Sequence, residues 1–142
     1  MKKLLSFALM FLLAFTLLGC QKVTLPYDLN GTVSVGIQAF NNDSSEPFAQ
    51  FIVEGKDSDA IVEMFSSLTL KELNYMEPSI RGYVFWFRTE NGDEIAKIEL
   101  PYRKYPWVVV KGTPYQDVDS GIDTEYLAQL VDIASTAGPM ER

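Results

Sequence analysis

The feature that most constrains the fold is a pair of alternating apolar segments joined by Asn91-Gly92. Residues 83–89 carry an aromatic side chain at every second position, and residues 94–100 continue the alternation after the turn. Asparagine and glycine tolerate the positive φ that tight hairpin turns require, so we predict a β-hairpin here. Trp86 is predicted to lie on one face, because successive side chains of a strand alternate. The other face should carry Tyr83, Phe85 and Phe87 together with Ala96, Ile98 and Leu100.

Further segments carry strand patterns. Residues 32–40 alternate apolar and polar side chains, and residues 48–53 follow a turn rich in Asn, Asp, Ser and Pro. Residues 107–110 and 113–118 flank Lys111-Gly112, which indicates another tight hairpin.

Two segments carry helix patterns. Asp57, Ser58 and Asp59 supply capping and acidic side chains that favour a helix N-terminus. A stripe at helical spacing follows, made of Ile61, Met64, Phe65 and Leu68. A second helix should begin with Asp123 or Thr124 as its cap and end at Gly138-Pro139. Its apolar face would consist of Leu127, Leu130, Val131 and Ala134.

These segments predict an α+β fold, with an antiparallel sheet of about five to six strands and two helices packed on one face. Residues 32–142 have the length of one ordinary domain, and we expect them to form a single domain.

The N-terminus has the layout of an export signal. Lys2 and Lys3 form a short positive region, and an apolar run extends over residues 4–18. As a helix this run would span only about 22 Å, less than the ~30 Å hydrocarbon core of a bilayer. We therefore favour a cleaved signal over a permanent transmembrane helix.

The apolar run ends in Leu17-Leu18-Gly19-Cys20, which resembles the lipobox of bacterial lipoproteins. The resemblance implies that the Cys20 thiol receives a diacylglyceryl group and that a signal peptidase then cleaves before Cys20. The alternative is an ordinary signal peptide with a cysteine nearby. Because Cys20 is the only cysteine in the chain, it cannot form an internal disulfide. Residues 1–19 are thus the predicted signal peptide, and residues 20–31 the lipidated N-terminus and a short tether.

These assignments predict a location on the extracytoplasmic face of the cell membrane. Residues 80–131 also resemble small lipoproteins of Gram-positive bacteria, through the Trp86 strand, the Asn91-Gly92 turn and the segment from Trp107 to Tyr115. That resemblance implies no activity and no site residues.

Composition narrows the classes of function. The net charge is −7, and it becomes about −9 when Lys2 and Lys3 leave with the signal. This excess of acid opposes binding to nucleic acid and adsorption to anionic bilayers, so no nucleic-acid partner is expected. The chain has no histidine, which excludes Ser-His-Asp catalysis and histidine-ligated zinc. Catalysis by a pair of carboxylates, as in glycosidases, is not excluded by the lack of histidine. We nevertheless expect that the protein is not an enzyme and has no cofactor.

Residues 117–125 alternate carboxylates with other side chains, and carboxylate oxygens at such spacing suggest a calcium site. The EF-hand template fails, because its sixth position is Ile122 instead of Gly and its twelfth is Ala128 instead of Glu. A surface turn leading into a helix N-terminus is the favoured alternative, and no metal site is predicted.

Aromatic side chains offer a candidate binding surface or, alternatively, core packing. The residues concerned are Trp86, Trp107, Tyr102, Tyr105 and Tyr115. The candidate contact patch is Tyr102, Arg103, Lys104 and Tyr105, a basic and aromatic segment between two prolines of an acidic protein.

The leading hypothesis is a membrane-anchored, non-enzymatic domain that binds an envelope protein, a peptide or a cell-wall component. The alternatives are a carboxylate-dependent envelope hydrolase and a structural or assembly subunit of an envelope complex.

Overall fold

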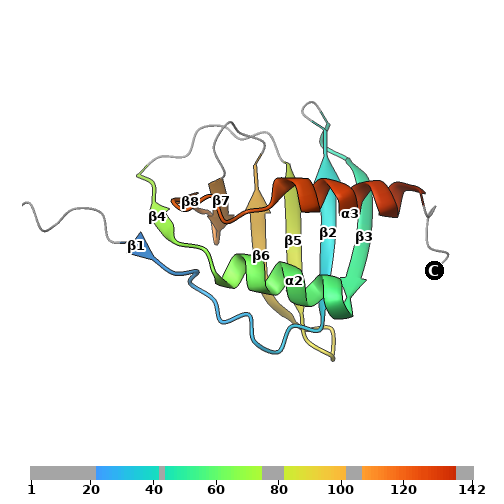
Figure 1. The fold of residues 1–142 in the computed structure, drawn as a ribbon, viewed down its shortest axis with the longest axis horizontal. Helices are drawn as coiled ribbons and strands as arrows, with labels where there is room; N and C mark the ends of the chain where they lie inside the picture. The colour runs from blue at the N-terminus through green and yellow to red at the C-terminus, as the bar shows by residue number, and fades with distance from the viewer. Residues whose placement is uncertain (1–21, 42–43, 75–81, 102–106, 137–142) are drawn as a thin grey trace, which may run out of the picture.

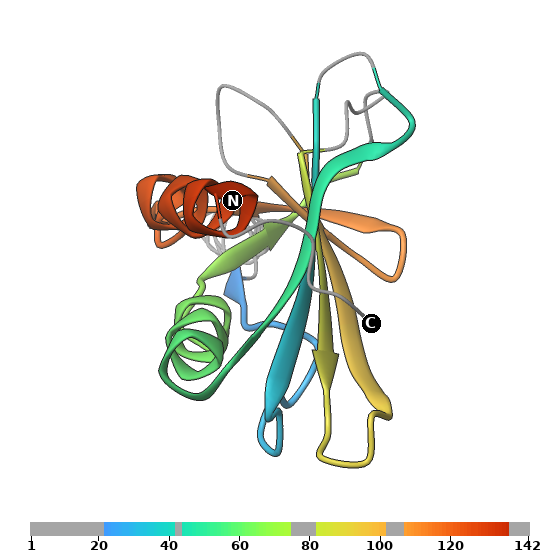
Figure 2. The same cartoon turned by 90° about the vertical axis from the view of Figure 1, so that its right-hand side faces the viewer.

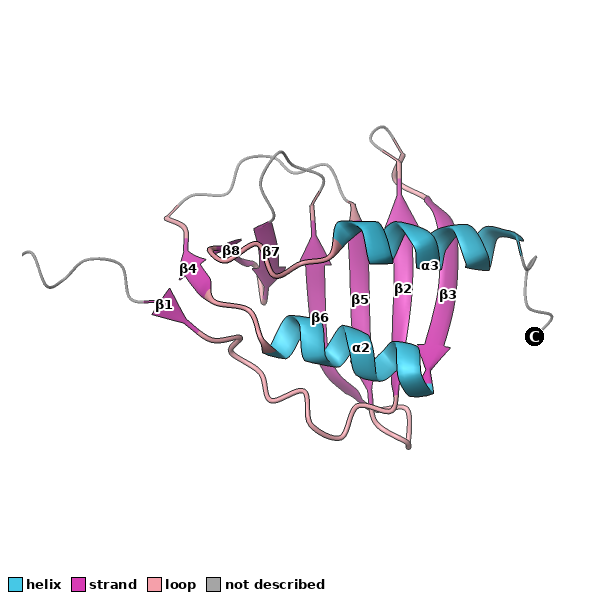
Figure 3. Ribbon diagram, viewed as in Figure 1, coloured by secondary structure: helices cyan, strands magenta, loops and turns pink. Residues whose placement is uncertain are grey.

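The computed structural model describes residues 22–41, 44–74, 82–101 and 107–136. Within these ranges the chain forms one antiparallel sheet of eight strands and two helices (Figure 1, Figure 3). The strands are β1 (Lys22–Val23), β2 (Ser34–Phe40), β3 (Pro47–Glu54), β4 (Leu70–Glu72), β5 (Tyr83–Arg88), β6 (Glu94–Leu100), β7 (Trp107–Val110) and β8 (Thr113–Asp117), and the helices are α2 (Gly55–Ser66) and α3 (Thr124–Thr136). The strand order is β1-β4-β8-β7-β6-β5-β2-β3. Both helices lie on the same side of the sheet (Figure 2).

The predicted α+β class with two helices is therefore confirmed, and the predicted number of five to six strands is wrong. The missed strands are β1 and β4, of two and three residues. Segments this short have no alternation to detect in a sequence, and they become strands only because a folded neighbour supplies their hydrogen bonds. α2 ends at Ser66, so Leu68 of the predicted helical stripe lies beyond the helix, and β4 follows at Leu70.

The β5–β6 hairpin has the predicted facing. Phe85 lies opposite Ile98 and is fully buried, whereas Trp86 lies opposite Lys97 on the other face. Its turn differs from the expected two-residue form. The Gly92 N–H donates to the Thr89 carbonyl over 2.9 Å, and of Asn91-Gly92 only the glycine has a positive φ, of 82°. The turn thus spans residues 89–92.

The β7–β8 hairpin is confirmed, with a two-residue turn. Lys111 and Gly112 have φ values of 52° and 78°, the pair of left-handed conformations that such a turn requires.

The helices begin close to their predicted positions. α2 follows β3 without a loop, because Gly55 adopts a φ of 58° that turns the chain directly out of the strand. This start precedes the predicted cap at Asp57 by two residues. α3 begins after Asp123, whose Oδ1 accepts the Tyr126 N–H over 2.9 Å, so Asp123 and not Thr124 is the cap.

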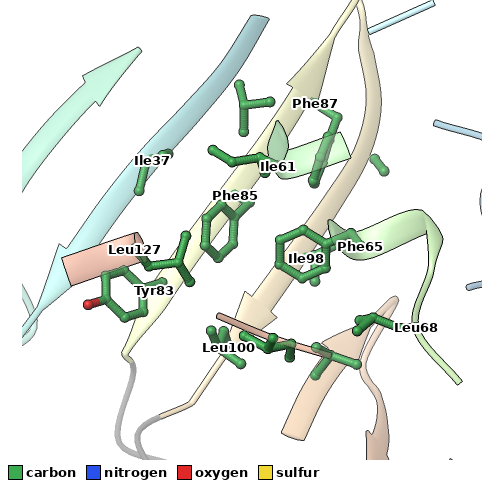
Figure 4. Close-up of a cluster of buried hydrophobic side chains, with 14 of the residues drawn as sticks. Ile37, Ile61, Phe65, Leu68, Tyr83, Phe85, Phe87, Ile98, Leu100 and Leu127 are labelled. Carbon is green, nitrogen blue, oxygen red and sulfur yellow. The ribbon is translucent and has the colours of Figure 1, made fainter. Parts of the chain in front are cut away.

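The core lies between the helices and the sheet (Figure 4). Phe65 of α2 packs edge-on against Phe85 and Phe87 of β5, with ring centroids 5.0 and 5.6 Å apart. Two residues of the expected tether also belong to this core: Leu25 and Leu29 are buried. The described part of that segment is therefore packed onto the domain.

Candidate functional site

The sheet face away from the helices, here called the open face, is the main surface that the fold leaves uncovered (Figure 2). Strand register decides which side chains it carries, because directly paired residues of an antiparallel sheet share a face. Trp86, paired with Gly36 and Lys97, lies on this face. The fully buried Phe85 and Ile98 lie on the helix side.

A small cluster occupies the middle of the open face. The Lys97 ammonium donates to Glu99 Oε1 over 2.9 Å and lies 5.8 Å from the centroid of the Trp86 ring. The Trp86 side chain lies over Gly36, where an added Cβ would be 3.8 Å from Trp86 Cβ and 3.9 Å from Cε3, the distances of ordinary van der Waals contact. The cluster therefore presents a cation, an anion and a partly exposed aromatic ring within a few ångströms of one another.

A pocket of about 430 Å³ adjoins this cluster. Its lining consists of Tyr27, Glu94, Lys97, Glu99, Val109, Lys111 and Gly112. Lys111, in the β7–β8 turn, places its ammonium 4.4 Å from the centroid of the Tyr27 ring. Two ammonium groups and two carboxylates thus surround a hollow whose size suits a small ligand or a few residues of a peptide.

The far end of the open face carries two half-exposed apolar side chains on either side of Gln50, whose Oε1 accepts a hydrogen bond from Gln38. Phe48 and Ile52 of β3 are each 49% exposed. β3 is the last strand in the sheet order, so one of its edges has no paired strand among the described residues.

The predicted aromatic surface is only partly assembled. Trp86 and Trp107 belong to the open face, whereas Tyr115 pairs with Val108 and is buried on the helix side. The remaining candidates lie outside the described residues, namely Tyr102 and Tyr105 of the proposed contact patch together with Arg103 and Lys104.

The acidic segment at residues 117–125 forms a turn. Asp117 is only 3% exposed, and its Oδ2 accepts the Ile122 N–H over 3.1 Å while its Oδ1 accepts the Asp119 N–H over 3.3 Å. Asp123 caps α3. Across the described part of the chain, no three Asp, Glu, His or Cys side chains gather as a metal site would require.

The residues that line the pocket do not form a recognisable pattern in the sequence. Lys97 and Glu99 were detectable, because they alternate with apolar residues on the face of the predicted hairpin that also carries Trp86. Tyr27 was not detectable, since its place depends on the folding of residues 24–33 against the domain.

Comparisons with protein-family models, with curated proteins and with solved structures found no match for this chain. In the portion of the chain that the structure describes, neither helix has the length and apolar character needed to cross a membrane.

Proposed function

We propose that this protein is an extracytoplasmic lipoprotein, anchored through Cys20, whose domain is a non-enzymatic binding module. Its ligand is a segment of an envelope protein, a peptide or a cell-wall component, bound on the open face beside Trp86. The observation that carries the proposal is the pocket lined by two lysines and two glutamates next to a partly exposed indole. The mixed charges favour a ligand that carries both signs itself, as peptides do.

The same pocket is less suited to hydrolysis. Glu94 and Glu99 are its carboxylates, and Glu99 already pairs with Lys97 over 2.9 Å. A glycosidase needs one carboxyl that retains its proton near neutral pH, which requires burial or a neighbouring negative charge. Glu99 instead has an ammonium group beside it and a side chain that is 36% exposed.

Site-specific photo-crosslinking in native membranes tests the binding proposal. A benzophenone amino acid replaces Trp86, and a matched control carries it at Glu63, an exposed residue of α2 on the helix side. We expect a discrete adduct from position 86 alone, weakened by Lys97→Glu in the same chain. Equal adducts from both positions, or none from position 86, would contradict the proposal.

Metabolic labelling tests the anchor. Wild-type protein should incorporate an alkynyl fatty acid, whereas Cys20→Ala should remain an unlabelled precursor, because the thiol is the acyl acceptor and cleavage follows lipidation. Equal labelling of both proteins would refute lipidation at Cys20.

A second candidate is an assembly subunit, favoured by the half-exposed Phe48 and Ile52 and by the edge of β3 that no described strand pairs with. Exposed apolar edge strands tend to pair with other chains. Ile52→Lys should then abolish a complex seen by native gel electrophoresis of membrane extracts and leave the crosslink from position 86 intact.

A further inference from the structure

A row of four paired residues crosses the β1 end of the sheet. Lys22 lies opposite Lys71, Lys71 opposite Gln116, and Gln116 opposite Trp107. These residues share the open face, since Val108 and Tyr115, the neighbours of Trp107 and Gln116, are buried on the helix side. We call Lys22, Lys71, Gln116 and Trp107 the basic row.

The basic row departs from the charge of the rest of the chain. Two lysines directly opposite each other in a sheet repel. In the described ranges neither lysine forms an ion pair with a carboxylate. The carboxylates of these strands, Glu72 and Asp117, pair with residues of the helix side. On a chain with a net charge of −7, this part of the open face presents ammonium groups without any strand carboxylate beside them.

The row also lies next to the proposed anchor. Lys22 follows Cys20 by two residues, so their Cα atoms are separated by at most about 7 Å of chain. Because β1 is part of the sheet, no long tether separates the domain from the lipid. β1 stands at one end of the long axis of the molecule, and β3 lies toward the other end (Figure 1).

When an acidic domain is held this close to an anionic bilayer, the charges on its faces decide which face turns toward the lipid. Surface charges act within a Debye length, about 8–10 Å near physiological salt, so only the face turned to the lipid contributes strongly. The anionic surface repels most of this chain and attracts lysines. We infer that the basic row is the surface with which the anchored domain docks onto anionic phospholipid headgroups. The inference rests on the proposed lipidation of Cys20.

Lysine footprinting of the full lipidated protein tests this docking. Protein purified from its membrane is reconstituted into vesicles of phosphatidylcholine alone or with added phosphatidylglycerol, and treated with an impermeant amine-acetylating reagent. Mass spectrometry then gives the labelling of Lys22 and Lys71 relative to Lys56, an exposed residue in the first turn of α2. This internal ratio removes the effect of vesicle sidedness.

We expect this ratio to fall by at least about five-fold in anionic vesicles, since each of the two lysines near an anionic surface favours the docked state by about that factor. It should recover at about 1 M salt, where the Debye length is about 3 Å. An unchanged ratio in protein that floats with the vesicles would overturn the docking surface and leave the anchor standing. Failure to float would instead overturn the anchor, and the docking with it.

A charge reversal separates docking from folding. Lys71→Glu places opposite charges across β1 and β4, which favours the strand pairing while removing the attraction to lipid. We expect this variant to lose the protection of Lys22. The matched variant Arg88→Glu, at the end of β5, has the same change in net charge and keeps Lys56 as the reference, so it should retain the protection. Retained protection of Lys22 in Lys71→Glu would refute the basic row as the docking surface.

Discussion

The Tyr126 hydroxyl donates a hydrogen bond to Asp57 Oδ1 over 3.0 Å, joining the first turn of α3 to the first turn of α2. Burial raises the pKa of the Tyr126 phenol from 10.0 to about 12, and the hydrogen bond to Asp57 and the charge of that carboxylate add to the increase. The contact is a polar link between the two helices.

Tyr126→Phe should lower the free energy of unfolding by about 0.5–1.5 kcal/mol, the usual net contribution of one hydrogen bond. The raised pKa means that the native state holds the phenolic proton more tightly than the unfolded state. The contribution is therefore complete below pH 10 and is lost as the pH rises toward about 12. The free energies of unfolding of the wild type and of Tyr126→Phe, measured by urea melts, should therefore become equal as the pH rises through this range. If the difference in free energy of unfolding between the two proteins stays constant as the pH rises, the native state does not hold the phenolic proton more tightly than the unfolded state.

Phe85→Ala should be far more destabilising than Trp86→Ala. Phe85 is fully buried against Phe65, and such a truncation costs about 3–5 kcal/mol. Trp86 is partly exposed on the open face, so its removal leaves no closed cavity. Urea melts measure both, and a larger cost for Trp86→Ala would mean that the two faces of β5 are inverted.

Ser58→Ala is expected to stabilise the protein. Ser58 is 1% exposed, and its hydroxyl has no hydrogen-bond partner in the described structure. A buried unsatisfied polar group costs about 1–3 kcal/mol, and alanine is also a better helix former. Thermal melts should show a higher midpoint. Ser66→Ala, at an exposed position of the same helix, controls for helix propensity.

Leu29→Ala tests whether the segment before β2 is part of the core. Leu29 is 2% exposed, and losing a side chain of this size from a packed core costs about 2–5 kcal/mol. A flexible tether would instead give no measurable change in a urea melt. Val33→Ala, at a residue 46% exposed, is the matched control and should change stability by less than about 1 kcal/mol.

The elements that could be predicted are those whose local pattern agrees with their packing. The facing of β5 and β6, the Lys111-Gly112 turn and a cap at Asp123 or Thr124 depend on residues close in the chain, so they could be predicted, and the structure then places the cap at Asp123. β1 and β4 are different, because two or three residues carry no period and their pairing is decided by distant strands. The pocket was missed for the same reason, since it brings Tyr27 against Lys111 of a turn far along the chain.

The last prediction concerns calcium and the acidic segment at residues 117–125. Asp117 uses both carboxylate oxygens on backbone N–H groups, of Asp119 and Ile122, and Asp123 uses one on the N–H of Tyr126. These bonds hold both carboxylates against the backbone turn, and no three Asp, Glu, His or Cys side chains of the described residues gather to supply the six to eight oxygen ligands that calcium needs.

Thermal melts with calcium and with chelator should therefore coincide. A ligand that binds only the native state would raise its stability by RT ln(1 + [L]/Kd), so a calcium-dependent rise in the midpoint would contradict this account. Asp117→Ala should lower stability by about 1–3 kcal/mol in both solutions, since it leaves the buried Ile122 N–H unpaired. Asp119→Ala is the matched control: its side chain is exposed, and its removal should have little effect with or without calcium.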